Sequence, residues 1–365
     1  MTSATVPFLD LRRLHASIRA ELSVALEEVI DGSAFVGSDA SAAFEHEFAE
    51  AHGALYAAGC GSGTDALTLA LVAAGIGPGD EVVVPAMTFV ATAEAVLHAG
   101  AEPLLVDVDP ETLLLSEEAV AAVRTRRTMA VLPVHLYGHA VPFDRIEAWQ
   151  QSGLTVIEDA AQAHLAKWKG RTVGTVGAAA AFSFYPGKNL GALGDGGAVL
   201  SADLAHHEAV LRRRNHGSVD KYRHVNVGWC SRLDGVQAAW LRVKLRHLAR
   251  WTEARRRLAD RYRAQLPDGI LVPWDEGAVH HLLVVRVPAE RRAEIAAVLE
   301  GKQIGTGLHY PFALSQQPAL AAWALPCPHA EKAASEVLSL PIDPLMREDE
   351  VDIVCDALRE ALARP

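Results

Sequence analysis

Cysteine and long hydrophobic segments are both scarce in this sequence. It has four cysteines among 365 residues, and they lie far apart, at positions 60, 230, 327 and 355. This number and spacing argue against a disulfide framework and a cysteine zinc site, so we expect reduced thiols. Apolar segments are interrupted by glycine, proline or a charged residue before the ~18 residues that a membrane-spanning helix needs. We therefore expect no membrane association.

Positive charge is also in the minority, because 45 acidic residues oppose 34 basic ones and the formal net charge is −11. A dedicated nucleic-acid-binding protein usually has the opposite balance. The N-terminus shows no basic stretch followed by an apolar segment, so we expect no secretory signal. Half of the residues are hydrophobic, which excludes a disordered chain. These features predict a cytoplasmic, globular protein, and an enzyme fits them best.

The sixteen histidines show no metal-binding spacing. His46 and His52 are six residues apart, whereas two ligands on one face of a helix are four apart. The pairs at 206–207 and 280–281 are adjacent, so their side chains point in different directions. We therefore expect no metal site.

Short β-branched segments alternate with helical segments from about residue 54 onward. This pattern predicts an α/β fold with a mostly parallel central sheet, covered by helices on both faces and binding its ligands beyond the carboxyl ends of the strands. The expected strands are 82–84, 104–108, 129–134, 154–157, 180–184 and 198–200, and the expected helices between them include 65–74, 88–99 and 116–124.

Residues 236–266 are predicted to form one long amphipathic helix. Its polar face is expected to be solvated rather than to bind nucleic acid. That face carries Arg242, Arg246, Arg250, Arg255, Arg256 and Arg257. Beyond it, the expected strands 281–287 and 304–310 and the expected helices 289–300, 329–338 and 348–362 indicate a smaller α+β unit. We therefore predict a large domain with an N-terminal arm (1–250) and a small C-terminal domain (251–365).

The glycine-rich segment GSGTDAL at 61–67 precedes a predicted helix. Such a turn presents unpaired backbone amides and the positive end of a helix dipole to an anion, most often a phosphate. Its G-x-G-x-G spacing does not match the dinucleotide-binding fingerprint. Thr64 and Asp65 could also serve only as a helix cap.

A second segment, VIEDAAQAHLA at 156–166, brings Glu158 and Asp159 to the carboxyl end of a predicted strand. A carboxylate at this place can cap a helix, bind a metal or face a cationic ring nitrogen. The residues alone leave these three alternatives open, with the cap favoured.

The third segment, AAFSFYPGKNLGALGDGG at 180–197, places Lys188 on a turn after a buried strand. Few charges lie near this lysine, and aromatic and leucine side chains flank it. Desolvation lowers the pKa of an amine and makes it a nucleophile that can form a Schiff base. A structural lysine that anchors a carboxylate is the alternative.

Together the three segments match what pyridoxal 5′-phosphate (PLP) requires, which is an anion cradle, a lysine and a carboxylate for the pyridine nitrogen. Ser183 adds a hydroxyl, and Phe89 in the segment PAMTFVAT at 85–92 adds an aromatic ring that could stack on the cofactor. Without the other three features, Phe89 would be interpreted as a residue of the hydrophobic core.

These segments resemble those of the DegT/DnrJ/EryC/StrS family of sugar aminotransferases. The similarity extends over nearly the whole chain. It is densest at GPGDEVVVPA (77–86), EDAAQAH (158–164) and SFYPGKNLGALGDGGAV (183–199), with further matches at VPFLDL (6–11), FEHEFA (44–49) and EVLSLPIDP (336–344). The resemblance implies the type I fold of aspartate aminotransferase and a PLP-dependent transaminase.

The resemblance also implies a role for each matching residue. Lys188 would hold the cofactor covalently, and Asp159 would face its pyridine nitrogen. The remaining cofactor contacts would be Gly63, Thr64 and Ser183 at the phosphate, Phe89 against the ring and Gln162 at the phenolic oxygen. Tyr185, His309 and Tyr310 would contact the substrate.

Two segments depart from the family pattern. In GWCSRLDGVQAA at 228–239, Cys230 stands where the family has an asparagine that contacts the phosphate of the partner subunit's cofactor. A thiol is a poorer donor than an amide, so this contact is expected to be weakened, replaced or mediated by water. HYPFALSQQ at 309–317 lacks the later histidine of the family motif, which affects the expected sugar or nucleotide contact.

The implied reaction moves an amino group from L-glutamate to the ketone of a nucleotide-linked deoxysugar, dTDP being the expected nucleotide. The segment 183–199 favours a 3-keto over a 4-keto sugar and a role in antibiotic or other natural-product biosynthesis. The family pattern further implies a homodimer with shared active sites. One alternative is PLP-dependent sugar dehydration, in which histidine replaces the lysine, and Lys188 argues against it. The other is a non-catalytic member of the fold.

Overall fold

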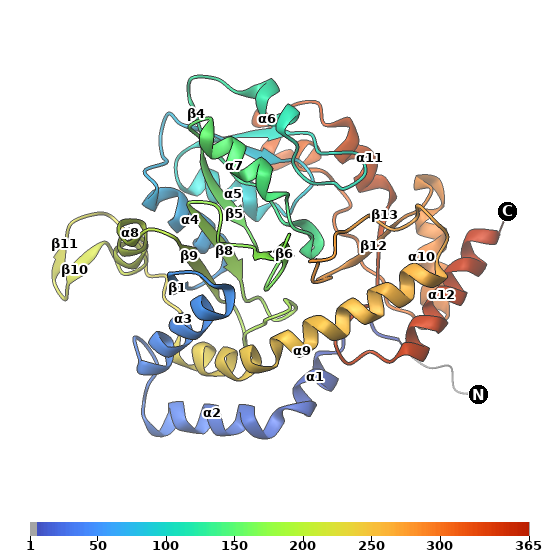
Figure 1. Ribbon diagram of the computed structural model, residues 1–365, viewed down its shortest axis with the longest axis horizontal. Coiled ribbons are helices and arrows are strands. Elements are labelled where there is room, and N and C mark those ends of the chain that lie inside the picture. The colour runs from blue at the N-terminus through green and yellow to red at the C-terminus, as the bar shows by residue number, and fades with distance from the viewer. Residues whose placement is uncertain (1–5, 365) are drawn as a thin grey trace.

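The computed structural model describes residues 6–364 and is built around a seven-stranded sheet (Figure 1). The strand order is β1-β9-β8-β5-β4-β2-β3, and only β9 runs antiparallel to its neighbours. The strands are β1 (Tyr56–Cys60), β2 (Glu81–Pro85), β3 (Glu102–Val106), β4 (Thr128–Val131), β5 (Thr155–Asp159), β8 (Ala179–Ser183) and β9 (Gly197–Ser201). The predicted α/β class with a mostly parallel sheet is confirmed.

Helices cover both faces of this sheet, which explains why its strands are apolar without alternation. In β2, Val82 and Val84 belong to the hydrophobic core on one face, and Val83 belongs to the core on the other. The helices are α3 (Asp39–His52), α4 (Gly63–Ala73), α5 (Ala91–His98), α6 (Glu117–Val123), α7 (Phe143–Gln151) and α8 (Leu204–Arg214). Of these, α4, α5 and α8 pack together over one face.

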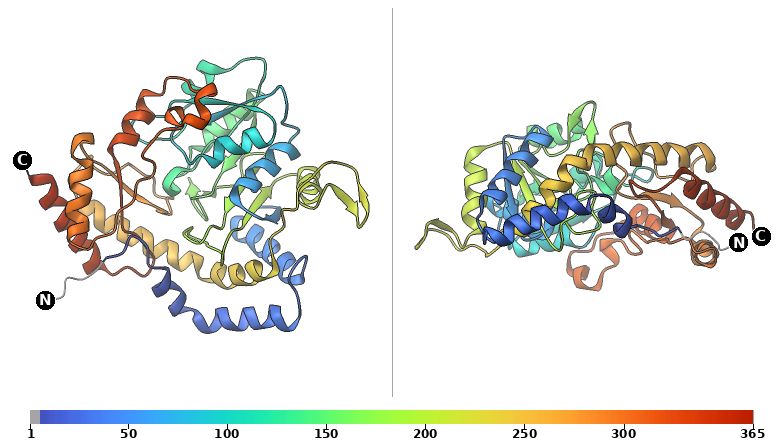
Figure 2. Two further views of the ribbon diagram at one scale, coloured as in Figure 1. Left: turned by 180° about the vertical axis from the view of Figure 1, so that it is seen from behind. Right: turned by 90° about the horizontal axis from the view of Figure 1, so that it is seen from below.

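The long helix α9 (Gly235–Gln265) connects the two ends of the molecule. It packs against α2 (Arg19–Asp31) and α3 near its start and against α12 (Glu348–Ala363) near its end, as both Figure 1 and Figure 2 show. Helix α1 (Leu11–Ser17) precedes α2. The predicted domain boundary at residue 250 falls inside α9, so one uninterrupted helix belongs to both parts.

The C-terminal part has a third hydrophobic core, formed by α10 (Arg292–Gly301), α12 and the antiparallel pair β12 (Leu283–Arg286) and β13 (Val337–Leu340). The predicted strand at 304–310 is wrong, because this segment makes only isolated bridges, Val6 with Ile304 and Gly307 with Ser339. The residues that follow the second bridge, His309 and Tyr310, line the cavity described below.

The remaining elements are small. They are α11 (Pro328–Glu336), the hairpin strands β6 (Lys167–Trp168), β7 (Arg171–Thr172), β10 (Ser218–Asp220) and β11 (Arg223–His224), and the 3-10 helices η1 (Leu136–Gly138), η2 (Ala289–Arg291), η3 (Leu314–Gln316) and η4 (Pro318–Trp323). The β10–β11 hairpin projects away from the body of the molecule (Figure 2). Within residues 6–364, no helix has both the length and the apolar character needed to cross a membrane.

One prediction about α9 is also wrong. Arg255 was expected on a solvated face, but only 4% of it is exposed. Its guanidinium is covered by the backbone at His280 and Ile342, to whose carbonyl oxygens it donates hydrogen bonds of 3.1 and 2.9 Å. The end of α9 therefore has protein on both sides, which the periodicity of one helix cannot reveal.

Candidate active site

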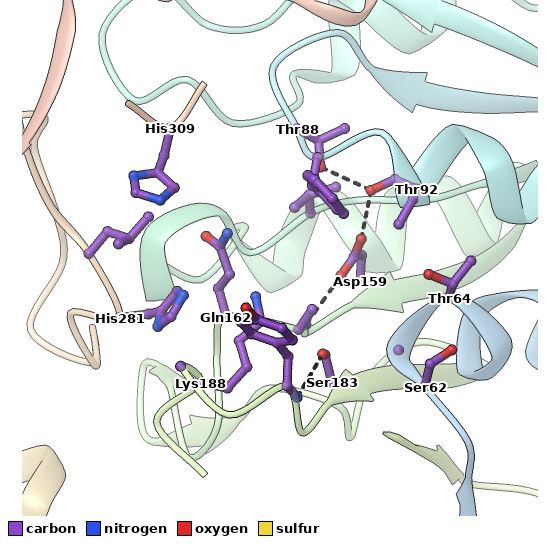
Figure 3. Close-up of a pocket in the computed structure, with 18 of the residues that line it drawn as sticks. Ser62, Thr64, Thr88, Thr92, Asp159, Gln162, Ser183, Lys188, His281 and His309 are labelled. Carbon is purple, nitrogen blue, oxygen red and sulfur yellow. Dashed lines mark hydrogen bonds between the residues drawn. The ribbon is translucent and has the colours of Figure 1, made fainter. Parts of the chain in front are cut away.

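A cavity of about 620 Å³ opens at the carboxyl ends of the parallel strands, where the sheet meets the C-terminal part. Figure 3 shows side chains from separate segments converging on it. The cavity brings together every predicted site residue except Cys230, namely Gly63, Thr64, Phe89, Asp159, Gln162, Ser183, Tyr185, Lys188, His309 and Tyr310. Within residues 6–364, no cluster of histidine, cysteine or carboxylate side chains suited to a metal ion was found.

The first turn of α4 forms one wall of the cavity. Ser62 caps this helix by accepting a hydrogen bond of 3.1 Å from the amide of Asp65, so neither Thr64 nor Asp65 is the cap. Gly63 is needed because a Cβ at this position would lie 2.6 Å from the Cβ of Ser183. The helix terminus therefore lies against the end of β8, and backbone amides and hydroxyls surround one space, as a phosphate requires.

Asp159 lies at the end of β5, and its buried carboxylate accepts hydrogen bonds from the hydroxyl of Thr92 (2.8 Å) and the amide of Ala161 (3.2 Å). Burial raises the pKa of Asp159, although these hydrogen bonds and the charge of Lys188 lower it. A carboxylate in this position gains stability from a cationic N–H group placed opposite it in the cavity.

Glu158, the other candidate carboxylate of this segment, serves a different purpose. It is buried outside the cavity and binds Nε2 of His135 at 2.9 Å and the amides of Gly174 and Gly177 at 3.0 and 2.8 Å. Burial opposes its ionisation, but His135 and the backbone amides lower its pKa overall. Glu158 therefore connects the end of β5 to His135 and to the loop at 174–177. Of these two carboxylates, only Asp159 faces the cavity.

Lys188 reaches the cavity from the turn that follows β8. Its amide donates a hydrogen bond of 2.8 Å to the carbonyl of Tyr185, which fixes the turn. Burial lowers the pKa of Lys188 to about 8, against the charge of Asp159, which raises it. No residue in the described part of the chain accepts a hydrogen bond from its Nζ atom. This amine is available to react.

Gln162 is held in place by two hydrogen bonds. Its Oε1 atom accepts a hydrogen bond of 2.6 Å from the amide of Tyr137, and its Nε2 atom donates one of 2.9 Å to the hydroxyl of Tyr310. The ring of Phe89 lies 5.8 Å from that of Tyr310, centroid to centroid, and is 55% exposed. Phe89 is therefore an aromatic wall of the cavity rather than part of the core.

Cys230 lies outside this cavity and is exposed. Its thiol accepts a hydrogen bond of 3.2 Å from Arg232, while the adjacent Ser231 accepts one of 3.0 Å from the amide of Gly61. The hydroxyl of Ser231 also donates to Asp65 at 2.7 Å. Ser231, not Cys230, thus connects this segment to the α4 turn of the same chain.

Sequence reasoning missed several side chains that line the cavity, among them Thr92, His281 and Arg255. Thr92 lies in the first turn of α5, and the hydroxyl of Thr88, in the loop before this helix, lies 2.9 Å from its hydroxyl. From its sequence position, His281 suggests only a possible metal ligand. Neither it nor Arg255 lies in a motif, and only the packing of the C-terminal part on the sheet brings them into the cavity.

Residues 16–359 match the model of the DegT/DnrJ/EryC1/StrS aminotransferase family. The chain belongs to this family. Among its relatives is a dTDP-3-amino-3,4,6-trideoxy-α-D-glucose transaminase of Streptomyces venezuelae, 44% identical over 364 residues, which are 97% of this chain and 96% of that protein. Another is a UDP-N-acetyl-3-dehydro-α-D-glucosamine 3-aminotransferase of Acidithiobacillus ferrooxidans, 41% identical over 99% of this chain and 100% of that protein.

The fold of this family member is also found in solved structures. The X-ray structure of DesV from S. venezuelae in complex with a ketimine intermediate matches with a TM-score of 0.95 and 43% identity, covering 99% of both chains. The predicted family, type I fold and enzyme class are therefore confirmed: the protein is a PLP-dependent aminotransferase. The described residues fit this cofactor, since the cavity holds a lysine of lowered pKa, a buried carboxylate and the cradle at Gly63.

Proposed function

We propose that this aminotransferase transfers the amino group of L-glutamate to the ketone of a nucleotide-linked 3-keto- or 4-keto-deoxysugar, with dTDP as the nucleotide. The observation that carries the proposal is that Lys188 and Asp159 share one cavity in a chain whose relatives aminate dTDP- and UDP-sugars. As the resemblance of segment 183–199 suggests, the 3-keto sugar is preferred.

In this proposal PLP is held by residues from several segments. The first turn of α4 and the hydroxyls of Thr64 and Ser183 bind the phosphate, and Phe89 and Gln162 contact the ring and its phenolic oxygen. When bound, PLP supplies an electron-withdrawing ring that stabilises the negative charge left when a proton leaves the donor's α-carbon.

The catalytic residues in this proposal are Asp159 and Lys188. Asp159, ionised, keeps a proton on the pyridine nitrogen, since a carboxylate opposite a ring N–H favours the charged ring. The Nζ atom of Lys188 would hold the cofactor covalently and, once displaced by the donor's amine, would take the proton from the donor's α-carbon. A pKa of about 8 leaves enough neutral amine near neutral pH for both tasks. Tyr185, His309 and Tyr310 orient the sugar nucleotide.

A cytoplasmic homodimer in antibiotic or other natural-product biosynthesis completes the proposal. The homodimer is supported by the β10–β11 hairpin, which projects from the body of the molecule (Figure 2). This hairpin and the segment after it expose several apolar side chains to solvent. These side chains are Val219, Tyr222, Val225, Val227 and Trp229. Cys230 at the end of this segment lies outside its own cavity, as a residue that serves the partner's site would.

The experiment is product analysis by mass spectrometry with L-glutamate and a panel of 3-keto- and 4-keto-deoxysugars, each linked to dTDP and to UDP. The proposal expects one amino sugar, formed from a dTDP-linked ketosugar. Amination of none of these sugars would reject the substrate class. Loss of a hydroxyl group without transfer of nitrogen would instead show the dehydration chemistry that the presence of Lys188 argues against.

A further inference from the structure

Arg255 is a buried cation on the wall of the active-site cavity, and only part of its guanidinium is used by the fold. Its Nη1 atom donates hydrogen bonds to the carbonyls of His280 (3.1 Å) and Ile342 (2.9 Å). Within residues 6–364, its Nε and Nη2 atoms have no hydrogen-bond acceptor, and no carboxylate forms an ion pair with it.

The charge of Arg255 is also poorly balanced by its surroundings. Asp343 is the acid whose charge acts on it, yet this carboxylate already accepts a hydrogen bond of 2.8 Å from the amide of Leu345 and lies 3.9 Å from Nη2 of Arg13. Burial lowers the pKa of Arg255 to about 10 despite Asp343, so the group is still a cation at neutral pH. A buried cation is costly unless an anion pairs with it.

The proposed reaction brings an anion into this cavity with each substrate. We propose that Arg255 binds a carboxylate of the amino donor through the N–H groups that the fold leaves free. A guanidinium can hold a carboxylate with two parallel hydrogen bonds, whereas an ammonium acts only as a point charge. This inference rests on the proposed function and names the residue that selects the donor.

The diphosphate of the sugar nucleotide offers the same anionic chemistry, but the surroundings of Arg255 favour a carboxylate. A diphosphate lies in the middle of its molecule, between nucleoside and sugar, and therefore needs space on both sides. Arg255 is 4% exposed and lies in the wall of the cavity. A carboxylate at the end of a small molecule can reach this buried guanidinium. Lys188 and His281 line the same cavity, and burial together with the charges of Lys188 and Arg255 lowers the pKa of His281.

The test compares R255Q and R255K with a control on the same helix. Arg256 also binds the backbone before β12, at the carbonyls of Ala278 (2.9 Å) and Gly277 (3.2 Å), but it does not line the cavity. R256Q therefore removes an equivalent structural arginine and leaves the cavity intact. The probe is glutarate, a dicarboxylate without an amino group, whose binding to the PLP-loaded enzyme is measured by calorimetry.

We expect R255Q to raise both the glutarate Kd and the KM for L-glutamate by about 10- to 100-fold, the range for a hydrogen-bonded charge pair. R255K should lie between R255Q and wild type, and R256Q should stay within about twofold of wild type. The rate at which the aminated enzyme passes its amino group to the ketosugar should not change in R255Q.

An unchanged glutarate Kd in R255Q would overturn the inference, as would a loss confined to the ketosugar half of the reaction, which would assign Arg255 to the diphosphate. If R255Q does not fold, R255K decides, because a glutarate Kd equal to that of wild type would contradict two-point binding. The proposed function is judged separately, by whether the wild-type enzyme aminates a nucleotide ketosugar at all.

Discussion

The hydroxyl of Thr92 donates a hydrogen bond of 2.8 Å to Oδ2 of Asp159, and the hydroxyl of Thr88 lies 2.9 Å from that of Thr92 (Figure 3). Thr92 on the first turn of α5, supported by Thr88 in the loop before it, thus holds the carboxylate that the cofactor ring is proposed to face. Because Asp159 is buried, each bond that favours its ionised form matters for the reaction.

Removal of the Thr92 hydroxyl should therefore weaken the proposed function of Asp159. We expect T92V to lower kcat about tenfold or more, as for a hydrogen bond to a charged group, and T88V to lower it less, because Thr88 acts only through Thr92. T252V is the control, since Thr252 is buried outside the cavity and its hydroxyl has no partner among residues 6–364. Equal kcat values for T92V and wild type would contradict this role.

Asp159 itself can be tested with D159N. The variant should still fold and bind PLP, but it should lose most of its turnover, because a neutral amide cannot keep a proton on the ring nitrogen. The measurement is single-turnover kinetics with L-glutamate, followed by the absorbance of the cofactor. Kinetics like those of wild type would remove Asp159 from the mechanism.

Lys188 is the second catalytic residue of the proposal. K188A should fold with an unchanged circular dichroism spectrum and show no measurable turnover. In the wild-type enzyme, borohydride should fix the cofactor on the peptide that contains Lys188. It should not label Lys244, a buried lysine whose pKa is also about 8 but whose Nζ binds the carbonyl of Gly191 at 2.6 Å. Label on any other lysine would disprove the assignment.

The pH dependence of cofactor uptake follows from the lowered pKa of Lys188. Only the neutral amine can attack the aldehyde of PLP, so the reconstitution rate of cofactor-free enzyme should rise with pH and level off above about 8. The Asp159 carboxylate raises this pKa, so D159N should shift the midpoint to lower pH. Stopped-flow absorbance between pH 6 and 10 measures both, and a shift of the midpoint to higher pH in D159N would contradict the electrostatic argument.

Glu158 should affect stability and not chemistry. Its pKa is lowered in the folded state, so its contribution is present above the unfolded-state pKa of about 4.3 and is lost as the pH falls through the folded-state value. E158Q should cost about 1 to 3 kcal/mol of unfolding free energy at pH 7, measured by denaturation with urea. E147Q, at an exposed ion pair with Arg171, should change it by less than about 1 kcal/mol.

The site residues that could be predicted from the sequence are those that lie within one recognisable motif, at the end of a predicted strand. Lys188 follows a buried strand and Asp159 ends another, so the strand pattern placed both at one edge of a parallel sheet. The strand β1 was not predicted, because YAAGC is short and rich in alanine and glycine, which are not typical of strands.

Arg255 and residues 304–310 show why the rest could not be predicted. Helical periodicity distinguishes the apolar face of α9 from its polar face. It does not reveal that the C-terminal part of the chain covers the polar face near residue 255. The segment 304–310 has a strand-like sequence, yet it pairs only at isolated bridges because its neighbours are the N-terminal arm and β13. Both facts depend on how distant parts of the chain pack.

Helix α9 makes contact with the loop after Lys188 through Lys244 and with the loop before β12 through Arg255, so its length sets the separation of two cavity walls. One additional residue between these positions would rotate the rest of the helix by about 100° and turn Arg255 away from the cavity. Insertions and deletions should therefore be tolerated in the turn at 267–269 but not in the eleven-residue interval from Lys244 to Arg255. The number of residues between Lys244 and Arg255 in α9 therefore determines whether Arg255 faces the cavity.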